Sequence, residues 1–578
     1  MINASKDTLQ SYFQTHTQYK VPFFQRSYVW DEDNWESLWE NIYQVYLDAK
    51  IDKRSEHFIG TIITKQIPAV KLGQNWNDLI DGQQRLTTIS ILLKSLADCC
   101  KSDRPFLRDK INGLLEYQDD KGEKFTRIEL CRNDMPYFRS IIQGENIANL
   151  KNQENMIIEA YEYFKARAKD FSDEDISMFT NVILERVPVI SMLLSSDDDE
   201  QVIFDTINSL GVKLTTSELL KNYIFKDKNL EALFDGMWAP VFEADEETVG
   251  FWNKDKTSGR IIRTNIEVLL YCYLMIETQK EIKLEKLYKE YKDWLSDKNI
   301  EQRKAFLNNL KQYATLYSNF PEGEELNEIA FGEIEKRFFH VIENLSIATA
   351  YPLVLYIYKQ VKNGTERNRI LELLESYLIR RNICRLTTKN YNNLFISIIQ
   401  KLDKSRKDGD LITADLLKII LASFTEDTNK FPDDAAFKLG FKDAQLSNQN
   451  SREILYCIAL YQRSSPLDDV KKLSSSSYSV EHMMPVKWKD NWMTEEMDEN
   501  KKAIRDKTLK TLGNLTLITK RLNSKLSNAP WDKKKLTLKD HSTLNMTVKY
   551  INEPMWNEEK IANRAAELFN DALRIWNY

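Results

Sequence analysis

The residues best suited to catalysis lie near the C-terminal end of the chain, around one histidine. His482 follows Glu481 and stands three residues before Pro485 in the segment YSVEHMMPVKW. A histidine titrates near neutral pH, so it can take a proton from water. Carboxylate and amide oxygens are hard ligands of the kind that Mg²⁺ binds. Glu481 and His482 therefore offer a metal ligand and a base, which are the groups that hydrolysis of a phosphodiester needs.

The surroundings of His482 favour this interpretation over the ordinary one, in which a lone histidine is only a hydrogen-bonded polar residue. Asn514, Asn523 and Asn528 follow in a segment rich in lysine. Residues 501–549 contain thirteen Lys and Arg but three Asp, although the net charge of the whole chain is −6. A solvated lysine face is the usual alternative, but a basic surface around a base suits a polyanionic substrate. The basic residues that we predict to bind DNA are Lys520, Arg521, Lys525, Lys533 and Lys534.

Short secondary-structure elements must position these groups. Residues 480–483 and 515–518 are predicted as two strands because of their β-branched content. Residues 520–526 are predicted to begin a helix that brings Asn523 back over the strand of His482.

The segment resembles the C-terminal HNH-type nuclease domain of GmrSD-type Type IV restriction enzymes, in which EHxxP is followed by LGNLTLL and N…N…K. The resemblance implies a ββα-metal fold that uses Mg²⁺ or Mn²⁺. It assigns His482 as the general base and Asn514 as a brace, with Asn523 as the third member of the catalytic set. Glu481, Asn523 and Asn528 are the implied metal ligands.

A second candidate site lies near the N-terminus, in the sequence DGQQR. Residues 76–80 are predicted as a strand, Asp81-Gly82 as a turn, and Gln83 as the start of a helix that buries one apolar face. A strand–turn–helix junction presents free backbone N–H groups to a phosphate, and Arg85 could donate two hydrogen bonds to it. The simpler alternative is that Asp81 caps the helix and Arg85 is solvated.

Three further segments strengthen the first interpretation: VPFFQRSYVW, FIGTI and FDTINSLGVKLTTSELLKNY. In the first, Asp31 follows as the expected N-cap of a helix; in the third, Thr215 and Glu218 form an expected capping box, and Asn208 is the residue expected to face the site. Together with DGQQR they resemble the ParB/sulfiredoxin-like N-terminal domain of the same GmrSD-type proteins. That domain binds and hydrolyses nucleoside triphosphates and is linked to sensing modified DNA. The nucleotide-binding residues implied are Gln25, Arg26, Asp81, Gly82, Gln84 and Arg85.

Length, composition and cysteine content indicate what kind of protein carries the two candidate sites. With 578 residues, 42% hydrophobic and 29% charged, the chain has the balance of a soluble protein of about three domains. We expect it to be cytoplasmic, because it starts with no basic-then-apolar signal and contains no apolar run long enough to span a bilayer. Six cysteines without a C-x-x-C pair predict buried, reduced thiols.

The middle of the chain reads as helical. Residues 266–273 and 370–378 carry apolar side chains at helical spacing. His340 follows two phenylalanines and is predicted as a core histidine. Arg380, Arg381 and Arg385 are predicted as a basic helix end, which could either touch DNA or form surface salt bridges. The acidic run 197–200 is predicted as a solvated loop.

The sequence thus predicts an α+β, predominantly helical protein with a ParB-like domain (1–225), a helical connector (226–450) and an HNH-type nuclease domain (451–578). The leading hypothesis is a nucleotide-regulated endonuclease that cuts modified double-stranded DNA, with phage DNA as its expected source. One alternative is a nucleotide-dependent sensor with a degenerate HNH docking module; another is a nuclease toxin without modification specificity. Homodimerisation is left open.

Overall fold

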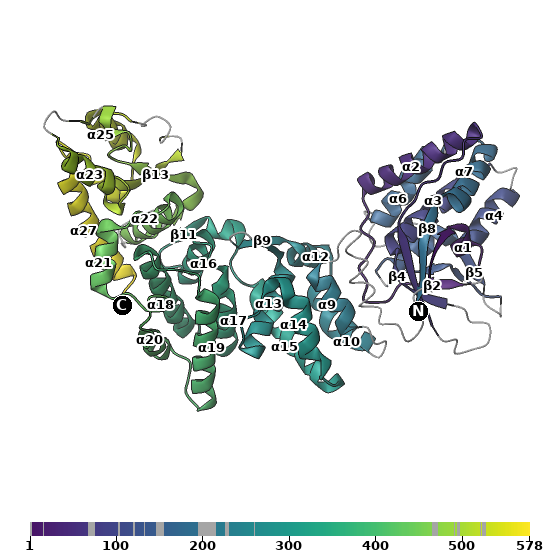
Figure 1. The fold of residues 1–578 in the computed structure, drawn as a ribbon, viewed down its shortest axis with the longest axis horizontal. Coiled ribbons are helices and arrows are strands. Elements are labelled where there is room, and N and C mark those ends of the chain that lie inside the picture. Colours follow the sequence, from purple (N-terminus) through teal and green to yellow (C-terminus); the bar gives the residue numbers. More distant parts are fainter. Residues whose placement is uncertain are drawn as a thin grey trace. The chain divides into compact units, whose positions relative to one another are not determined.

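The structure is a computed structural model of the chain. It describes all residues except 1–2, 16, 68–75, 102–104, 119–121, 132, 146–154, 195–214, 226–229, 259–260, 465–471, 491, 494–496, 521 and 523–527. The chain divides into two compact units, Met1–Phe234 and Asp235–Tyr578. The further predicted boundary at residue 450 falls inside the second unit and stays a prediction. Helices predominate, together with one mixed sheet and several two-stranded sheets, as expected for an α+β protein (Figure 1).

The first unit is built on a six-stranded mixed sheet with the strand order β1-β8-β3-β4-β2-β7. The strands are β1 (Asn3–Thr8), β8 (Pro188–Leu194), β3 (Thr61–Gln66), β4 (Trp76–Asp81), β2 (Gln18–Lys20) and β7 (Ile128–Glu129). Strand β4 pairs antiparallel with β3 and parallel with β2, so it lies inside the sheet. The strand expected at 76–80 is confirmed, and the FIGTI segment leads into β3 at Thr61.

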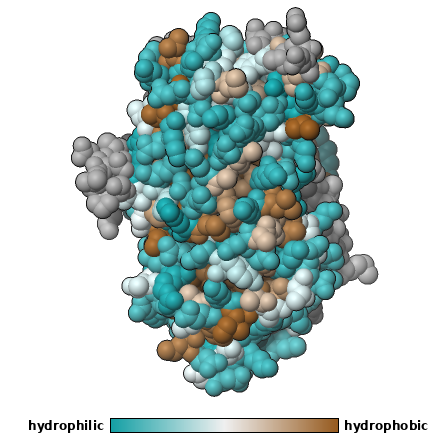
Figure 2. All heavy atoms as spheres, turned by 90° about the vertical axis from the view of Figure 1, so that its left-hand side faces the viewer, coloured by the Kyte–Doolittle hydropathy of each residue, from teal (hydrophilic) through white to brown (hydrophobic). Residues whose placement is uncertain are grey.

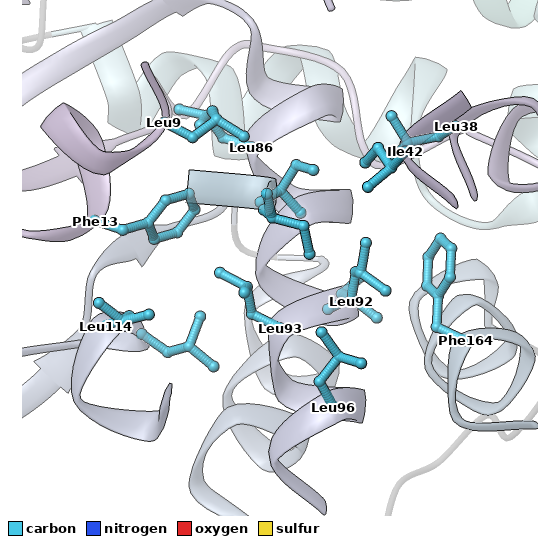
Figure 3. Packing of buried hydrophobic residues seen from close by; sticks show 14 of the residues in the cluster. Leu9, Phe13, Leu38, Ile42, Leu86, Leu92, Leu93, Leu96, Leu114 and Phe164 are labelled. Atoms are coloured by element: carbon cyan, nitrogen blue, oxygen red, sulfur yellow. The ribbon is translucent and has the colours of Figure 1, made fainter. Parts of the chain in front are cut away.

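Helix α3 (Gln83–Cys99) forms the centre of this unit. In Figure 3, Leu86, Leu93 and Leu96 of α3 lie among residues from several other elements, including Phe13 and Phe164. The apolar face predicted for this helix is confirmed, but the helix is buried on nearly every side. A polar side chain of this helix can be buried because it donates a hydrogen bond to the backbone of the helix. The hydroxyl group of Ser90, for example, donates to the carbonyl oxygen of Leu86 at 2.8 Å.

Helices α4, α5, α6 and α7 contact α3, and α2 packs against α6 and α7 (Figure 1). Asp31 caps α2 with a capping box, and Thr215 and Glu218 do the same for α9, as predicted. The elements are α1 (Gln10–Phe13), α2 (Glu32–Lys50), α4 (Pro105–Leu115), β5 (Glu116–Gln118), β6 (Lys124–Thr126), α5 (Met135–Gln143), α6 (Met156–Ala168), α7 (Asp173–Arg186), α9 (Thr216–Ile224) and α10 (Glu231–Leu233).

The second unit starts with helices that pack on one another, for example α13 on α17 and α16 on α18. They are α11 (Ala239–Phe242), α12 (Glu246–Asn253), α13 (Asn265–Thr278), α14 (Leu287–Ser296), α15 (Ile300–Ser318), α16 (Ile334–Asn344), α17 (Tyr351–Gln360), α18 (Gly364–Ile383), α19 (Tyr391–Lys407), α20 (Ala414–Ala422), α21 (Asp434–Asp443) and α22 (Asn448–Gln462). Small strands interrupt them, namely β9 (Asp255–Ser258), β10 (Ile261–Thr264) and β11 (Glu328–Ala330). The helical character predicted for this region is confirmed.

The last part of the second unit holds the predicted catalytic segment. Its elements are β12 (Lys472–Ser474), β13 (Tyr478–His482), α23 (Glu499–Thr508), β14 (Leu515–Thr519), α25 (Trp531–His541), α26 (Asn545–Val548) and α27 (Glu558–Ile575). One hydrophobic core joins this part to the preceding helices, because it contains Ile379, Phe437 and Ile454 together with Leu515 and Phe569. The surface seen in Figure 2 is predominantly hydrophilic, with its hydrophobic residues in small separate groups.

Two basic residues of the middle region are not where the sequence placed them. Arg380 and Arg381 were predicted as a helix end that touches DNA or forms surface salt bridges, but both are fully buried. The guanidinium group of Arg380 bonds to the carbonyl oxygen of Trp576 at 2.8 Å, and that of Arg381 to the carbonyl oxygen of Lys430 at 2.8 Å. Both satisfy backbone carbonyls inside the protein, and Arg380 also pairs with the carboxylate of Asp434 at 2.7 Å, so neither is placed to contact DNA.

The prediction for His340 is confirmed, since the residue is 2% exposed. Its Nε2 atom lies 3.1 Å from Oε2 of Glu453. Within the part of the chain that the structure describes, no helix is long and apolar enough to cross a membrane.

Candidate functional site

Strands β13 and β14 form an antiparallel pair that carries the predicted base. Glu481 lies opposite Thr516, and His482 lies opposite Leu515. Both strands were predicted, and the structure confirms them with small differences at their ends. The helix predicted at 520–526 falls mostly outside the described residues.

Alternation along β13 sends Glu481 and His482 to opposite faces of the strand. The carboxylate of Glu481 is buried, and the imidazole of His482 is half-buried. Lys534 of α25 contacts strand β13 of the hairpin at two points. Its Nζ atom lies 2.5 Å from Oε1 of Glu481 and 2.7 Å from the carbonyl oxygen of His482. This contact ties helix α25 to the strand that bears the candidate base.

The electrostatic environment keeps His482 neutral. Burial is the main reason that its pKa falls to about 4, and the positive charges of Lys534 and Lys510 act in the same direction. A neutral imidazole can accept a proton over the whole physiological pH range. Burial also raises the pKa of the Glu481 carboxyl and lowers that of the Lys534 ammonium, while their mutual attraction opposes both shifts.

Asn514 holds the turn that follows His482. Its Oδ1 atom accepts hydrogen bonds from the backbone N–H of Met484 (2.8 Å) and from Nε1 of Trp556 (3.0 Å). Its Nδ2 atom donates to the carbonyl oxygens of Met484 (2.8 Å) and Leu509 (2.9 Å). The side chain is fully buried and uses its whole hydrogen-bonding capacity on the protein. Asn514 thus braces the turn after His482, which is the role expected for it, and it is a positioning residue.

Helix α27 holds the LGN turn in place through Arg564. No sequence pattern predicted this contact. Arg564 is completely buried, and its NH1 atom donates to the carbonyl oxygens of Gly513 (2.9 Å) and Leu515 (2.7 Å). The turn and the helix approach so closely that a Cβ atom on Gly513 would overlap the carbonyl oxygen of Ile561. The glycine of the LGN motif was the one available signal of this packing.

The structure describes two of the three predicted metal ligands, Glu481 and Asn528. Within the described residues, no group of three or more His, Cys, Asp or Glu side chains could hold a metal ion. Glu481 does not fit the ligand role predicted for it, because Lys534 already neutralises its buried carboxylate. Asn523 lies outside the described residues, and Asn528 is half-buried.

The predicted DNA-binding residues separate into three groups. Lys520 and Lys533 are exposed, as a contact to DNA requires. Arg521 and Lys525 lie outside the described residues. Lys534 is wrongly predicted, because it is completely buried and pairs with Glu481. Exposed Lys510, which was not among the predicted DNA-binding residues, is close enough to His482 to lower its pKa.

In the first unit, two glutamines tie the QRSYV loop to the junction of β4 and α3. Nε2 of Gln25 donates to the carbonyl oxygen of Leu79 at 2.9 Å. Oε1 of Gln84 accepts from the backbone N–H of Val29 at 2.9 Å, and its Nε2 donates to the carbonyl oxygen of Ser27 at 3.1 Å. The two segments predicted to form one site therefore lie together, but these amides serve to hold them there.

The DGQQR junction itself places two charged side chains beside an open helix end. Gly82 is the N-cap of α3 in the left-handed conformation (φ +95°), and no side chain caps the helix. Arg85 lies 2.9 Å from Asp81 and donates to the carbonyl oxygen of Thr61 at 2.5 Å. Its guanidinium group packs against Gly60, where an added Cβ would lie 3.4 Å from Cζ. The glycine of FIGTI thus makes room for the arginine of DGQQR.

Arg26 connects this junction to helix α9. Its NH1 atom lies 3.5 Å from Oε1 of Glu218, which also belongs to the capping box at Thr215. The QRSYV loop, the DGQQR junction and the described part of the third segment, from Thr215 onward, thus converge within the first unit. Asn208, which was expected to face the site, lies outside the described residues.

Comparison with protein families identifies the class of protein to which these two sites belong. The family model described as "GmrSD restriction endonuclease, N-terminal domain" matches residues 8–225, and the model for the C-terminal domain of GmrSD restriction endonucleases matches residues 431–571. The chain is a restriction endonuclease of the Type IV class, which acts on DNA. The matches together cover more than half of its length, and it belongs to the GmrSD restriction endonuclease family. No curated protein matches the chain.

Proposed function

We propose that this protein is a nucleotide-regulated, metal-dependent endonuclease that cuts modified double-stranded DNA, and that His482 is its general base. The observation that carries the proposal is the half-buried, neutral imidazole of His482 at the end of a braced hairpin. We assign the hairpin β13–β14 to a ββα-metal (HNH) site and the mixed sheet of the first unit to a ParB/sulfiredoxin-like domain.

The residues of the hairpin perform the chemistry as follows. His482 accepts the proton of the attacking water, for which a neutral ring is required. Lys534 holds the backbone at His482, and Asn514 holds the turn after it, so the ring keeps its direction while the proton moves. Exposed Lys510 and Lys533 attract the phosphate backbone, since each adds a positive charge near the hairpin.

The proposed metal is Mg²⁺ or Mn²⁺. When bound, it would supply positive charge to the phosphate and the leaving oxygen. Mg²⁺ keeps several of its own waters and needs only one or two protein ligands, so the lack of a three-ligand cluster among the described residues is compatible with it. Glu481 is not part of this proposal, because its carboxylate is engaged by Lys534.

We propose that the nucleoside triphosphate binds at the N-terminus of α3. The backbone N–H groups of its first turn have no side-chain cap, and a helix N-terminus attracts phosphate. Arg85 and Arg26 add two positive charges at the same junction, each now paired with a carboxylate. Nucleotide binding and hydrolysis would regulate cleavage by the second unit.

The decisive experiment replaces His482 by alanine. We expect the His482→Ala variant to lose cleavage by about 10²-fold or more, the usual contribution of a general base, and to retain DNA binding and nucleotide hydrolysis. The matched control is His541→Ala, which removes an exposed histidine of α25 and should cut normally. Unchanged cutting by the His482→Ala protein would show that the base is wrongly assigned.

A substrate panel tests the remaining parts of the proposal. Modified and unmodified DNA, and RNA, are each offered with Mg²⁺ and with each nucleoside triphosphate. Cleavage confined to modified DNA and altered by a nucleotide is expected. Cutting of unmodified DNA or RNA without nucleotide would instead indicate a nuclease toxin.

A further inference from the structure

The second unit contains a polar cavity of about 320 Å³ beside the open end of the β13–β14 hairpin. Four separate parts of the chain line it: the 3₁₀ helix 323–326 with Asn327 after it, the last turn of α16, the first turn of α22, and the serine-rich turn before β13. Lys520, directly after β14, completes the lining. Two of these parts, helices α16 and α22, contact each other.

The cavity carries an excess of positive charge. Arg452 and Lys520 line it as cations, and Glu343 is its one carboxylate. The negative charge of that carboxylate is compensated by the ammonium group of Lys256, because Oε1 of Glu343 lies 3.5 Å from Nζ of Lys256. His340 also borders the cavity, with its ring engaged by buried Glu453. The charges that remain available to a ligand are therefore those of Arg452 and Lys520.

The polar walls are held in place by bonds within the protein. NH2 of Arg452 donates to Oδ1 of Asn344 at 3.0 Å, and Nε2 of Gln449 donates to the backbone carbonyl of Asn344 at 2.5 Å. The backbone N–H of Ser475 donates to the carbonyl oxygen of Asn327 at 2.7 Å. Because a guanidinium group has five N–H donors, Arg452 can hold Asn344 and still donate to a ligand.

The position of Lys520 along the chain gives the approximate distance between the cavity and the candidate base, His482. In the hairpin, Tyr478 pairs with Thr519 at one end, and His482 pairs with Leu515 at the other. Lys520 is the next residue after Thr519. It lies five positions after Leu515, which corresponds to about 17 Å along a strand. One DNA strand places about one phosphate per 3.4 Å of helix axis, so a span of about 17 Å corresponds to about five nucleotides.

We propose that this cavity is a phosphate subsite, which binds the sugar–phosphate backbone of the DNA a few nucleotides from the phosphate that is cut. The proposal rests on the function proposed above. Arg452 and Lys520 bind the phosphate oxygens, and the hydroxyl groups of Ser475 and Ser476 add neutral donors. The cavity volume lies near the lower end of the roughly 300–1,000 Å³ usual for ligand pockets, which leaves room for a phosphate with its adjoining sugars. The backbone contact sets the register of the DNA over His482.

The test measures DNA binding by the full chain in the inactive His482→Ala background, at several salt concentrations. Arg452→Gln and Lys520→Gln are each expected to weaken binding about threefold and to reduce the slope of log K against log salt by about 1. Lys520 is exposed, so its replacement does not threaten folding. The matched control is Lys404→Gln, which removes an exposed lysine of α19 outside the cavity and should leave the slope unchanged.

Two outcomes would overturn the inference. One is a salt slope in both cavity variants equal to that of the parent. The other is an effect on nucleoside triphosphate binding without an effect on DNA binding, which would make the cavity a nucleotide site. Failure of the proposed function is recognised separately, because it requires that the His482→Ala protein still cuts DNA.

Discussion

Nζ of Lys534 lies 2.5 Å from Oε1 of Glu481, and both side chains are buried directly behind the candidate base. A buried ion pair adds little net stability, but loss of one partner leaves a charge without compensation in the protein interior. The same lysine also donates to the carbonyl oxygen of His482, so the pair joins α25 to the catalytic strand. Lys534 therefore contributes both to the position of His482 and to the stability of the fold.

Replacement of Lys534 by methionine should destabilise the protein strongly. The methionine keeps most of the volume but leaves the Glu481 carboxylate unpaired, which costs about 3–5 kcal/mol. Urea denaturation followed by tryptophan fluorescence measures the loss. The control is Lys533→Met at the exposed neighbouring position, which should change the free energy of unfolding by less than about 0.5 kcal/mol. The double variant Glu481→Gln with Lys534→Met should recover part of the loss; equal stability of the two single lysine variants would contradict the buried pair.

The pH dependence of cleavage should reflect the lowered pKa of His482. Its ring is neutral above about pH 4, so kcat/KM should not fall through protonation of this base between pH 7.5 and 5.5. An ordinary histidine would produce an acid limb near 6.5. Kinetics at limiting DNA concentration locate the limb. A limb near 6.5 that disappears in the His482→Gln variant would show that the ring is solvated.

The same shift affects stability with a definite sign. Because the pKa of His482 is lower in the folded chain than in the unfolded chain, the unfolded chain binds the proton first as the pH falls. The stability contributed by His482 is complete above about pH 6.5 and is lost as the pH falls towards 4. The difference in free energy of unfolding between the parent and the His482→Gln variant should therefore shrink over this range.

Replacement of Gly82 by alanine should destabilise the first unit by about 1–3 kcal/mol. Its φ of +95° is unfavourable for an L residue, and an added Cβ would lie 3.0 Å from Cγ1 of Ile62. Gly113 in α4 supplies the control, since an added Cβ there has open space and alanine favours a helix. Thermal unfolding should show a lower Tm for Gly82→Ala and an equal or higher Tm for Gly113→Ala. If the two variants melt alike, the left-handed turn is not required for stability.

Removal of divalent metal should separate binding from cleavage. We expect EDTA to abolish cutting and Mg²⁺ or Mn²⁺ to restore it, because the metal acts on the phosphate during chemistry. DNA binding should persist in EDTA, since lysines such as Lys510 and Lys533 provide it without metal. Gel-based cleavage and binding assays on one DNA distinguish the two effects. Full cleavage in EDTA would exclude the proposed metal.

Local patterns were read correctly where neighbouring residues determine the structure. The two strands of the hairpin, the Asp31 cap and the capping box of Thr215 with Glu218 depend on short-range bonds, and all were predicted. The strand–turn–helix at DGQQR was predicted for the same reason. The charged residues at 380, 381 and 534 were read as surface residues, since a lone Lys or Arg in a sequence is usually solvated.

The amino-acid sequence by itself determined the type of protein, the order of its elements and the position of its candidate base, because motifs and periodicity are local properties of the chain. Tertiary structure alone decided which polar groups remain available for chemistry. Burial of Lys534 against Glu481, the use of Asn514 by the turn after His482, and the cavity between α16 and α22 each bring together residues distant in sequence. Such contacts depend on how helices and strands pack, and desolvation then changes what each charged group can do.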